Sequence, residues 1–130
     1  MTPDHRFLVL VADDNEGLRA TTSLILREEG YEVSEAADGD DALAKLSAAP
    51  FDVALLDVRM PKTDGTTVVE RMIPGPPPPA VVMVTAYDIE NGIRARLGTR
   101  VFKYLRKPVA PAQLIEVVGE AARLARAAGQ

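Results

Sequence analysis

The chain has 130 residues, with 15 basic side chains, 19 acidic ones, a formal net charge of −4 and no cysteine. This length fits one domain with a real core, the acidic balance argues against direct nucleic-acid binding, and the lack of cysteine excludes disulfides and thiol chemistry. The opening residues carry only a short apolar run with acids close behind, which indicates neither a signal peptide nor a membrane span. We therefore expect a soluble cytoplasmic protein with no membrane partner.

The chain starts with two strand and helix pairs. Residues 7–13 form an apolar run that predicts a strand, and a helix follows within residues 14–30. The expected apolar face of this helix consists of Leu18, Thr22, Ile25 and Leu26. Residues 31–37 predict the second strand, and the second helix, at 38–49, has acids in its first turn, where the helix dipole favours them.

The third strand is predicted at residues 51–57 and a short helix at 64–73. The segment IPGPPPPA at 73–80 then ends this helix, because prolines cannot continue it. A docking site for a proline-recognising domain would explain the segment, but a PxxP spacing is unavoidable in any such run. A rigid connector is therefore the preferred interpretation.

The last two pairs complete the chain. A strand is predicted at residues 80–86, and the helix after it, at 88–97, should be marginal because Gly92 lies in its interior. The fifth strand, at 101–105, leads to a long helix at 110–128. The apolar stripe of this helix is expected to be Leu114, Val117, Val118, Ala121 and Leu124.

Strand and helix thus alternate five times, and three of the strands are continuously apolar. Such strands are typical of a parallel sheet that helices cover on both faces. We therefore predict an α/β fold: a flavodoxin-like, doubly wound (βα)5 sandwich with a parallel five-stranded sheet in the order 2-1-3-4-5. Residues 1–130 would form this single domain.

Polar side chains stand at the carboxyl ends of the predicted strands, which meet at one edge of a parallel sheet. They are Asp13 and Asp14 after the first strand, Asp57 at the end of the third, Thr85 at the end of the fourth and Lys107 after the fifth. Two like charges about 4 Å apart repel by roughly 4 kcal/mol at an effective dielectric near 20, so three acids call for a compensating cation. Carboxylates suit Mg²⁺, whereas zinc would need histidines or thiolates, and the only histidine, His5, precedes the first strand.

Each member of this group also has a simpler interpretation. Asp14 or Asn15 would cap the first helix, and Thr85 would be an ordinary β-branched strand residue. Lys107 would be a solvated lysine, although Pro108 behind it fixes the exit of the chain. The metal interpretation is preferred because it explains the group as a whole.

Four motifs, in this order, resemble the receiver domains of two-component response regulators: VADDN, LLDVRMPKTDG, VTA and KYLRKP. The resemblance covers about residues 7–125. It implies that Asp57 accepts a phosphoryl group from a phosphohistidine on a histidine kinase or a histidine phosphotransfer protein. It also implies a Mg²⁺ site formed by Asp14, Asp57 and the backbone carbonyl of Arg59. Asp13 would hold the metal through water.

The same resemblance implies roles for residues around the phosphate. Lys107 would pair with the acyl phosphate, Thr85 would move to donate a hydrogen bond to it, and Ala86 would border it. Tyr104 would turn inward behind Thr85, although a half-exposed strand aromatic is an alternative explanation for it. The bond between Lys107 and Pro108 would be cis, as in the family.

Two further positions would tune how long the phosphoryl group lasts. In the family, the residues two positions after the acceptor and two after the threonine flank the path of the attacking water. Here these are Arg59 and Tyr87, and both are bulky.

The sequence departs from the family pattern near its fourth helix. Gly98 comes early and TRVF fills the gap, so this helix should be short and its following loop long. The face made by the fourth helix, fifth strand and fifth helix is the usual output surface of the family. Four arginines would make it basic here: Arg94, Arg96, Arg100 and Arg106. They would bind an acidic output partner, as yet unknown, or would be only solvated charge.

The sequence therefore predicts a phosphorylation-activated signalling switch and no enzyme activity beyond slow self-dephosphorylation. One alternative is a receiver-fold interaction module that is not phosphorylated. Another is a metal-dependent aspartyl-phosphate phosphatase, but Arg59 stands where such enzymes need a second acid. A flavodoxin-like electron carrier is disfavoured, since the acids after the first strand would repel a flavin phosphate.

Overall fold

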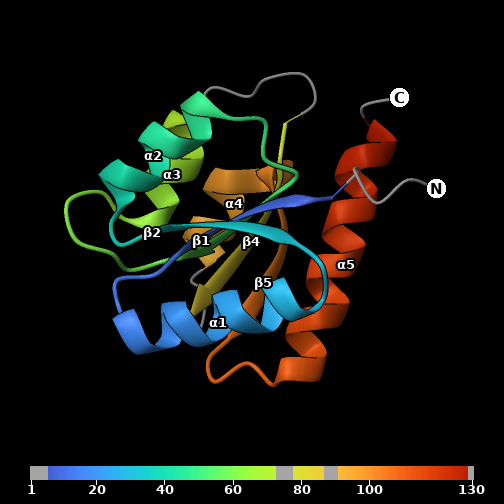
Figure 1. The fold of residues 1–130 in the computed structure, drawn as a ribbon. Coiled ribbons are helices and arrows are strands. Elements are labelled where there is room, and N and C mark those ends of the chain that lie inside the picture. The colour runs from blue at the N-terminus through green and yellow to red at the C-terminus, as the bar shows by residue number, and fades with distance from the viewer. Residues whose placement is uncertain (1–5, 73–77, 87–90, 129–130) are drawn as a thin grey trace.

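A computed structural model describes residues 6–72, 78–86 and 91–128 of the chain. In these residues, five parallel strands form one sheet in the order β2-β1-β3-β4-β5, which confirms the predicted topology (Figure 1). The strands are β1 (Leu8–Ala12), β2 (Glu32–Ala36), β3 (Val53–Asp57), β4 (Ala80–Thr85) and β5 (Val101–Arg106). Asp57 pairs with Val84, and Thr85 with Arg106, so the carboxyl ends of the last three strands are level.

Helices cover both faces of the sheet, as Figure 1 shows. They are α1 (Glu16–Glu28), α2 (Gly39–Ala48), α3 (Gly65–Arg71), α4 (Asn91–Leu97) and α5 (Pro111–Ala128). One buried cluster joins the sheet to α1 and α5, and another joins it to α2, α3 and α4. No helix in the described ranges combines the length and apolar character that crossing a bilayer requires.

Side-chain caps fix where three of the helices begin. Asn15 Oδ1 accepts a hydrogen bond from Leu18 N at 3.0 Å at the start of α1, so Asn15 rather than Asp14 is the cap. Asp38 and Asp64 cap α2 and α3 in the same way. The cap at Asn15 leaves the Asp14 carboxylate available for another role.

The predicted apolar faces need two corrections. Leu18 and Leu124 were both expected in the core, but Leu18 is 46% exposed and Leu124 is 50% exposed, so neither belongs to it. Ala122 and Ala125 are buried on α5 instead. The helix meets the sheet along a stripe turned slightly from the predicted one, which leaves Leu124 at its margin.

The described part of the fourth helix is short, as expected, but the long loop expected after it is wrong, because β5 begins at Val101 directly after a three-residue turn. α4 spans seven residues, and a 3₁₀ turn, Gly98–Arg100, follows it directly. Gly98 has a φ of +56°, a left-handed conformation that favours glycine at a helix end. Residues 73–77 of the proline segment lie outside the described part of the chain.

An ion pair ties α5 to the opposite end of the sheet from the predicted acids. Arg126 Nε lies 2.9 Å from Asp52 Oδ1, and its guanidinium stacks on the Phe7 ring at 4.4 Å. The other oxygen of Asp52 accepts a hydrogen bond from Leu8 N at 2.8 Å. The beginnings of β1 and β3 are thereby fastened to the last turn of α5.

Candidate functional site

The three predicted acids do converge at the carboxyl edge of the sheet. Asp13 follows β1 directly, Asp14 comes next, and Asp57 ends β3. Each of them offers a carboxylate oxygen within 4.8 Å of the others. Asp13 and Asp57 are buried, whereas Asp14 is exposed to solvent. The group is thus a half-buried acid pocket that opens on the side of Asp14.

Lys107 projects from the end of β5 into this acid pocket. Its Nζ lies 2.9 Å from Asp57 Oδ2 and 3.1 Å from Asp13 Oδ2. Burial by itself would lower the pKa of Lys107, but the hydrogen bonds and negative charges of Asp57 and Asp13 outweigh it, and the pKa is raised. Lys107 therefore stays cationic and is not a merely solvated lysine.

One lysine does not neutralise three acids. Burial raises the pKa of Asp57, the charge of Asp13 adds to the increase, and Lys107 only opposes it. The ionised form of Asp57 therefore lowers the stability of the folded protein, and a further cation in the pocket would reduce this loss. The oxygen-only ligand set suits a hard divalent ion.

Each buried carboxylate is oriented by two contacts. Asp57 Oδ1 accepts a hydrogen bond from Arg59 N at 3.2 Å, and Asp13 Oδ1 accepts one from Asn15 N at 2.9 Å. Their second oxygens both face Lys107. The side chain of Arg59 is exposed, so this residue contributes its backbone to the pocket.

A strap that sequence reasoning missed holds the backbone of Asp13. Arg19 donates from one NH group to Asp13 O at 2.8 Å and from Nε to Glu35 Oε1 at 3.2 Å. Glu35 in turn pairs with Arg27 at 3.4 Å. The partners come from α1 and β2, and no local pattern in the sequence indicates that they meet.

Thr85 and Ala86 lie at the carboxyl end of β4, the strand next to the one that carries Asp57. Thr85 is 4% exposed at the end of β4, and its carbonyl accepts a hydrogen bond from Lys107 N at 2.7 Å. Ala86 is exposed and lines a cavity of about 490 Å³ together with Asp13, Asp57 and Lys107. Tyr87 lies outside the described residues.

Tyr104 has a more specific setting than a half-exposed strand aromatic. Its hydroxyl is buried, with no hydrogen-bond partner among the described residues, and the Arg94 guanidinium lies 4.5 Å from the centre of its ring. Burial raises the pKa of Tyr104, and the nearby charge of Arg94 opposes this. A buried hydroxyl without a partner is costly, so a second position of this side chain would be readily stabilised. The bond between Lys107 and Pro108 is cis, as predicted.

The loop after Asp57 is packed too closely for side chains at two glycines. A Cβ atom on Gly65 would lie 2.2 Å from the carbonyl oxygen of Asp57, and one on Gly39 would lie 1.6 Å from that of Thr63. Thr63 also donates a hydrogen bond to Asp40 at the start of α2. The sequence shows these glycines only as turn signals, because close approach depends on segments that are distant in the chain.

Comparisons with known proteins agree with this geometry. The family model described as response regulator receiver domain matches residues 9–119. The sensory transduction protein RegX3 of Mycobacterium tuberculosis is 36% identical over 107 residues, which cover 82% of this chain and 47% of that protein. The positive alginate biosynthesis regulatory protein of Pseudomonas aeruginosa is 36% identical over 118 residues, or 88% of this chain and 47% of that protein. The chain therefore spans about half the length of these curated relatives.

Solved structures show the same similarity. A CheY-like response regulator receiver domain protein from Methanospirillum hungatei JF-1 superposes with a TM-score of 0.84 at 31% identity, covering 93% of this chain and 97% of that one. The chemotaxis response regulator CheY4 of Vibrio cholerae reaches a TM-score of 0.80 at 32% identity, covering 89% of this chain and 98% of that one.

Proposed function

The chain belongs to the response regulator receiver domain family of two-component systems, and from this we propose that it is a switch whose Asp57 becomes phosphorylated. The phosphoryl group would come from a phosphohistidine on a sensor histidine kinase or a histidine phosphotransfer protein, met in the cytoplasm. The observation that carries the proposal is the buried Asp57 carboxylate, set 2.9 Å from Lys107 beside two further acids. Residues 1–130 would act as a single receiver domain.

The acid pocket fits Mg²⁺, because the negative charge of its three carboxylates exceeds the positive charge of Lys107. Asp14, Asp57 and the backbone carbonyl of Arg59 would hold the ion, and Asp13 would act through water. When bound, the ion would neutralise negative charge on the phosphoryl oxygens and on Asp57.

The residues of this chain would do the remaining work. A carboxylate oxygen of Asp57 would attack phosphorus in line with the departing imidazole nitrogen, so that a P–O bond forms as the P–N bond breaks. Lys107 is already cationic and would stabilise charge on the transferred group. Thr85 would then donate a hydrogen bond to the acyl phosphate, with Ala86 at its border and Tyr104 turning inward behind Thr85.

Intact mass after incubation with Mg²⁺ and a small acyl phosphate tests the proposal. We expect the protein to gain one phosphoryl group, and a chelator to prevent the gain. Alkaline treatment should remove the group, because acyl phosphates hydrolyse readily. A mass that stays unchanged would instead favour the alternative of an interaction module that is not phosphorylated.

Phosphorylation would alter the output face of α4, β5 and α5. On this face Arg96 Nε pairs with Glu70 at 2.8 Å, and Arg94 lies over the ring of Tyr104. Movement of Tyr104 would therefore release or reposition Arg94. An acidic partner surface would be sensitive to such a change in basic charge.

The acyl phosphate would decay by slow self-hydrolysis, with Arg59 and Tyr87 shielding it from water.

The Arg19 strap leads to a prediction about metal affinity. Replacing Arg19 with methionine should weaken Mg²⁺ binding by about tenfold, because residues that orient metal ligands typically matter to this extent. Isothermal titration calorimetry measures the change. The matched control is Arg27→Met, since Arg27 contacts the same Glu35 but not Asp13. Equal weakening by the two variants would contradict a specific role for Arg19.

A second prediction concerns the surface where the phosphodonor docks. The cavity beside Asp57 is also lined by Leu18 of α1, which is 46% exposed. Leu18→Arg should slow transfer from a phosphorylated histidine phosphotransfer domain by about tenfold, since it places a charge in an apolar contact. Uptake from a small acyl phosphate should not change. Leu24→Arg is the control, because Leu24 lies on the same helix, is 58% exposed and does not line this cavity. Equal slowing by both variants would count against this docking face.

A further inference from the structure

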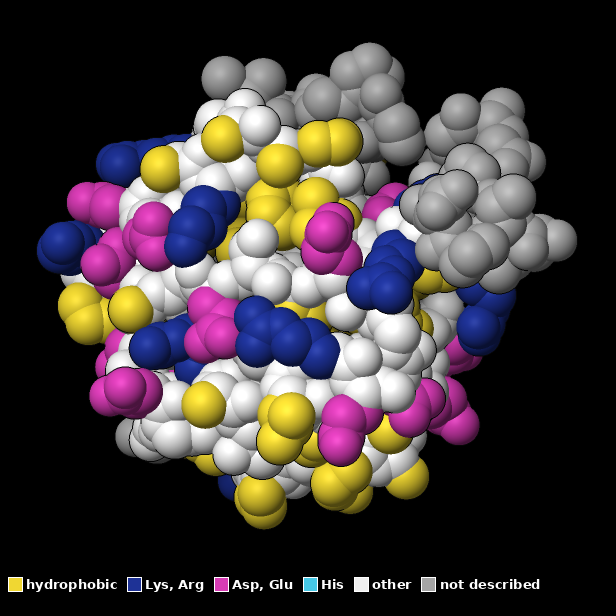
Figure 2. Space-filling model, viewed as in Figure 1, with side chains coloured by type: hydrophobic (Ala, Val, Ile, Leu, Met, Phe, Trp, Pro, Cys, Tyr) yellow, Lys and Arg dark blue, Asp and Glu magenta, His cyan; other side chains and the backbone are white. Residues whose placement is uncertain are grey.

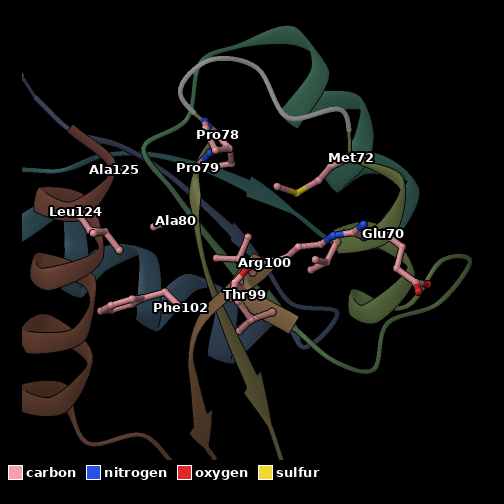
Figure 3. Close-up of a pocket in the computed structure, with 13 residues that line it drawn as sticks. Glu70, Met72, Pro78, Pro79, Ala80, Thr99, Arg100, Phe102, Leu124 and Ala125 are labelled. Carbon is pink, nitrogen blue, oxygen red and sulfur yellow. The ribbon is translucent and has the colours of Figure 1, made fainter. Parts of the chain in front are cut away.

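A groove of about 610 Å³ lies at the amino ends of β4 and β5, the opposite edge of the sheet from the acid pocket. We call it the amino-edge groove. It runs from the end of α3 past Arg100 and Phe102 to Leu124 on α5 (Figure 3). Its volume lies within the range of roughly 300–1,000 Å³ that is usual for sites that bind small molecules.

One end of the amino-edge groove is apolar. Figure 3 shows Phe102 extended toward α5, where Leu124 also points into the space, with Pro79 and Ala80 nearby. Leu124 is among the few large apolar side chains of the described residues that remain exposed. An apolar ligand body placed there would cover surface that the fold itself leaves in water.

The other end carries a positive charge that has no ion-pair partner among the described residues. Arg100 extends toward α3, where Glu70 and Met72 lie (Figure 3). Glu70 is engaged by Arg96, whose Nε lies 2.8 Å from its carboxylate. Arg100 has no hydrogen bond or ion pair with any residue in the described ranges, so one acid faces two arginines here. Figure 2 shows apolar and charged side chains interspersed over the face seen in Figure 1. The amino-edge groove differs from that face, because its lining is mostly apolar and Arg100 provides a positive charge at one end.

From this juxtaposition we propose that the amino-edge groove binds a small amphipathic anion, an aromatic carboxylate or sulfonate. The aromatic body lies between Phe102 and Leu124, and the anionic group faces Arg100. The groove shares no residue with the acid pocket, so a ligand can bind there while Asp57 is not phosphorylated.

A pair of fluorescent probes tests the proposal. The first, 1-anilinonaphthalene-8-sulfonate, has an aromatic body and one anionic group, and the second, N-phenyl-1-naphthylamine, has the same body without the charge. The chain contains no tryptophan, so probe fluorescence can be read without interference. We expect saturable binding at one site, about fivefold tighter for the sulfonate, because an exposed ion pair contributes up to about 1 kcal/mol.

Four variants locate the binding. Arg100→Gln should weaken only the sulfonate, by about fivefold, and so remove the difference between the probes, while Leu124→Ser should weaken both. The controls Lys103→Gln and Leu24→Ser change an exposed charge and an exposed leucine outside the groove and should leave both affinities unchanged. Binding that does not saturate, insensitivity to Arg100→Gln, or equal loss in a control would overturn the proposal. A thermal melt of each variant excludes unfolding as the cause.

Discussion

Replacing Asp57 with asparagine is expected to abolish phosphoryl uptake and, without metal, to make the folded protein more stable. The first effect follows because the amide has no nucleophilic carboxylate oxygen to form the acyl phosphate. The second follows because burial and the charge of Asp13 raise the pKa of Asp57 despite its contact with Lys107. A neutral side chain of nearly the same shape removes that cost.

The stability effect has a definite dependence on pH. Asp57 has a raised folded-state pKa, so it adds no penalty where both states are protonated, below its ordinary value of 3.8. The penalty grows as the pH rises from this ordinary value to the folded-state pKa, and it is complete above the folded-state pKa. Thermal melts with a chelator should therefore show no advantage of Asp57→Asn at low pH and a clear advantage at neutral pH.

Asp64→Asn is the control for this variant. Asp64 caps α3 on the surface, and asparagine caps a helix about as well, so phosphoryl uptake and stability should both be retained. Any phosphoryl gain by Asp57→Asn would show that another residue is the acceptor. A lower melting temperature at neutral pH without metal would mean that Lys107 compensates Asp57 fully.

Gly65→Ala is expected to reduce the free energy of unfolding by about 3 kcal/mol or more. The added Cβ would lie 2.2 Å from Asp57 O and 3.0 Å from its carbonyl carbon. These are backbone atoms of a buried strand, so they cannot move aside as a flexible side chain would. Relief would also strain the hydrogen bond from Gly65 N to Val58 O, 2.8 Å long, which joins the loop to β3. Urea denaturation followed by circular dichroism measures the loss.

Gly92→Ala tests whether the lack of room for a Cβ atom, and not the loss of a glycine as such, causes the expected destabilisation by Gly65→Ala. A Cβ on Gly92 would meet nothing within 4 Å, and the residue lies in α4. Alanine should therefore stabilise the protein by roughly 0.5–1 kcal/mol through its helix propensity. Similar effects of the two substitutions would refute the steric explanation for Gly65.

Much of the fold could be predicted because its signals are local. Continuous apolar runs identified three of the strands, and the alternation with helices left few topologies to choose from. The errors concern Leu18 and Leu124, where helical spacing alone decided the core face. Spacing places residues around a helix, but it does not say how far a neighbouring element extends over them.

The part of the candidate site that lies at strand ends could be predicted, because the order of the strands in the sheet brings Asp13, Asp57 and Lys107 together. Arg19 escaped prediction because its partners are a backbone carbonyl and a side chain on another strand. The stacking of Arg94 on the Tyr104 ring could not be predicted either, because it is a contact between a helix and a strand that depends on how the two are placed in space. Contacts of this kind become visible only once the backbone is in place.

The contact between Lys107 and Asp13 joins residues 94 positions apart, and this has a consequence for synthesis of the chain on the ribosome. β5 lies at the edge of the sheet and is the last strand to be made, so the nascent chain carries the three acids without their lysine. The acid pocket is complete only after β5 pairs with β4. A bound cation would then act mainly on the finished domain, slowing its unfolding and contributing little to the early steps of folding.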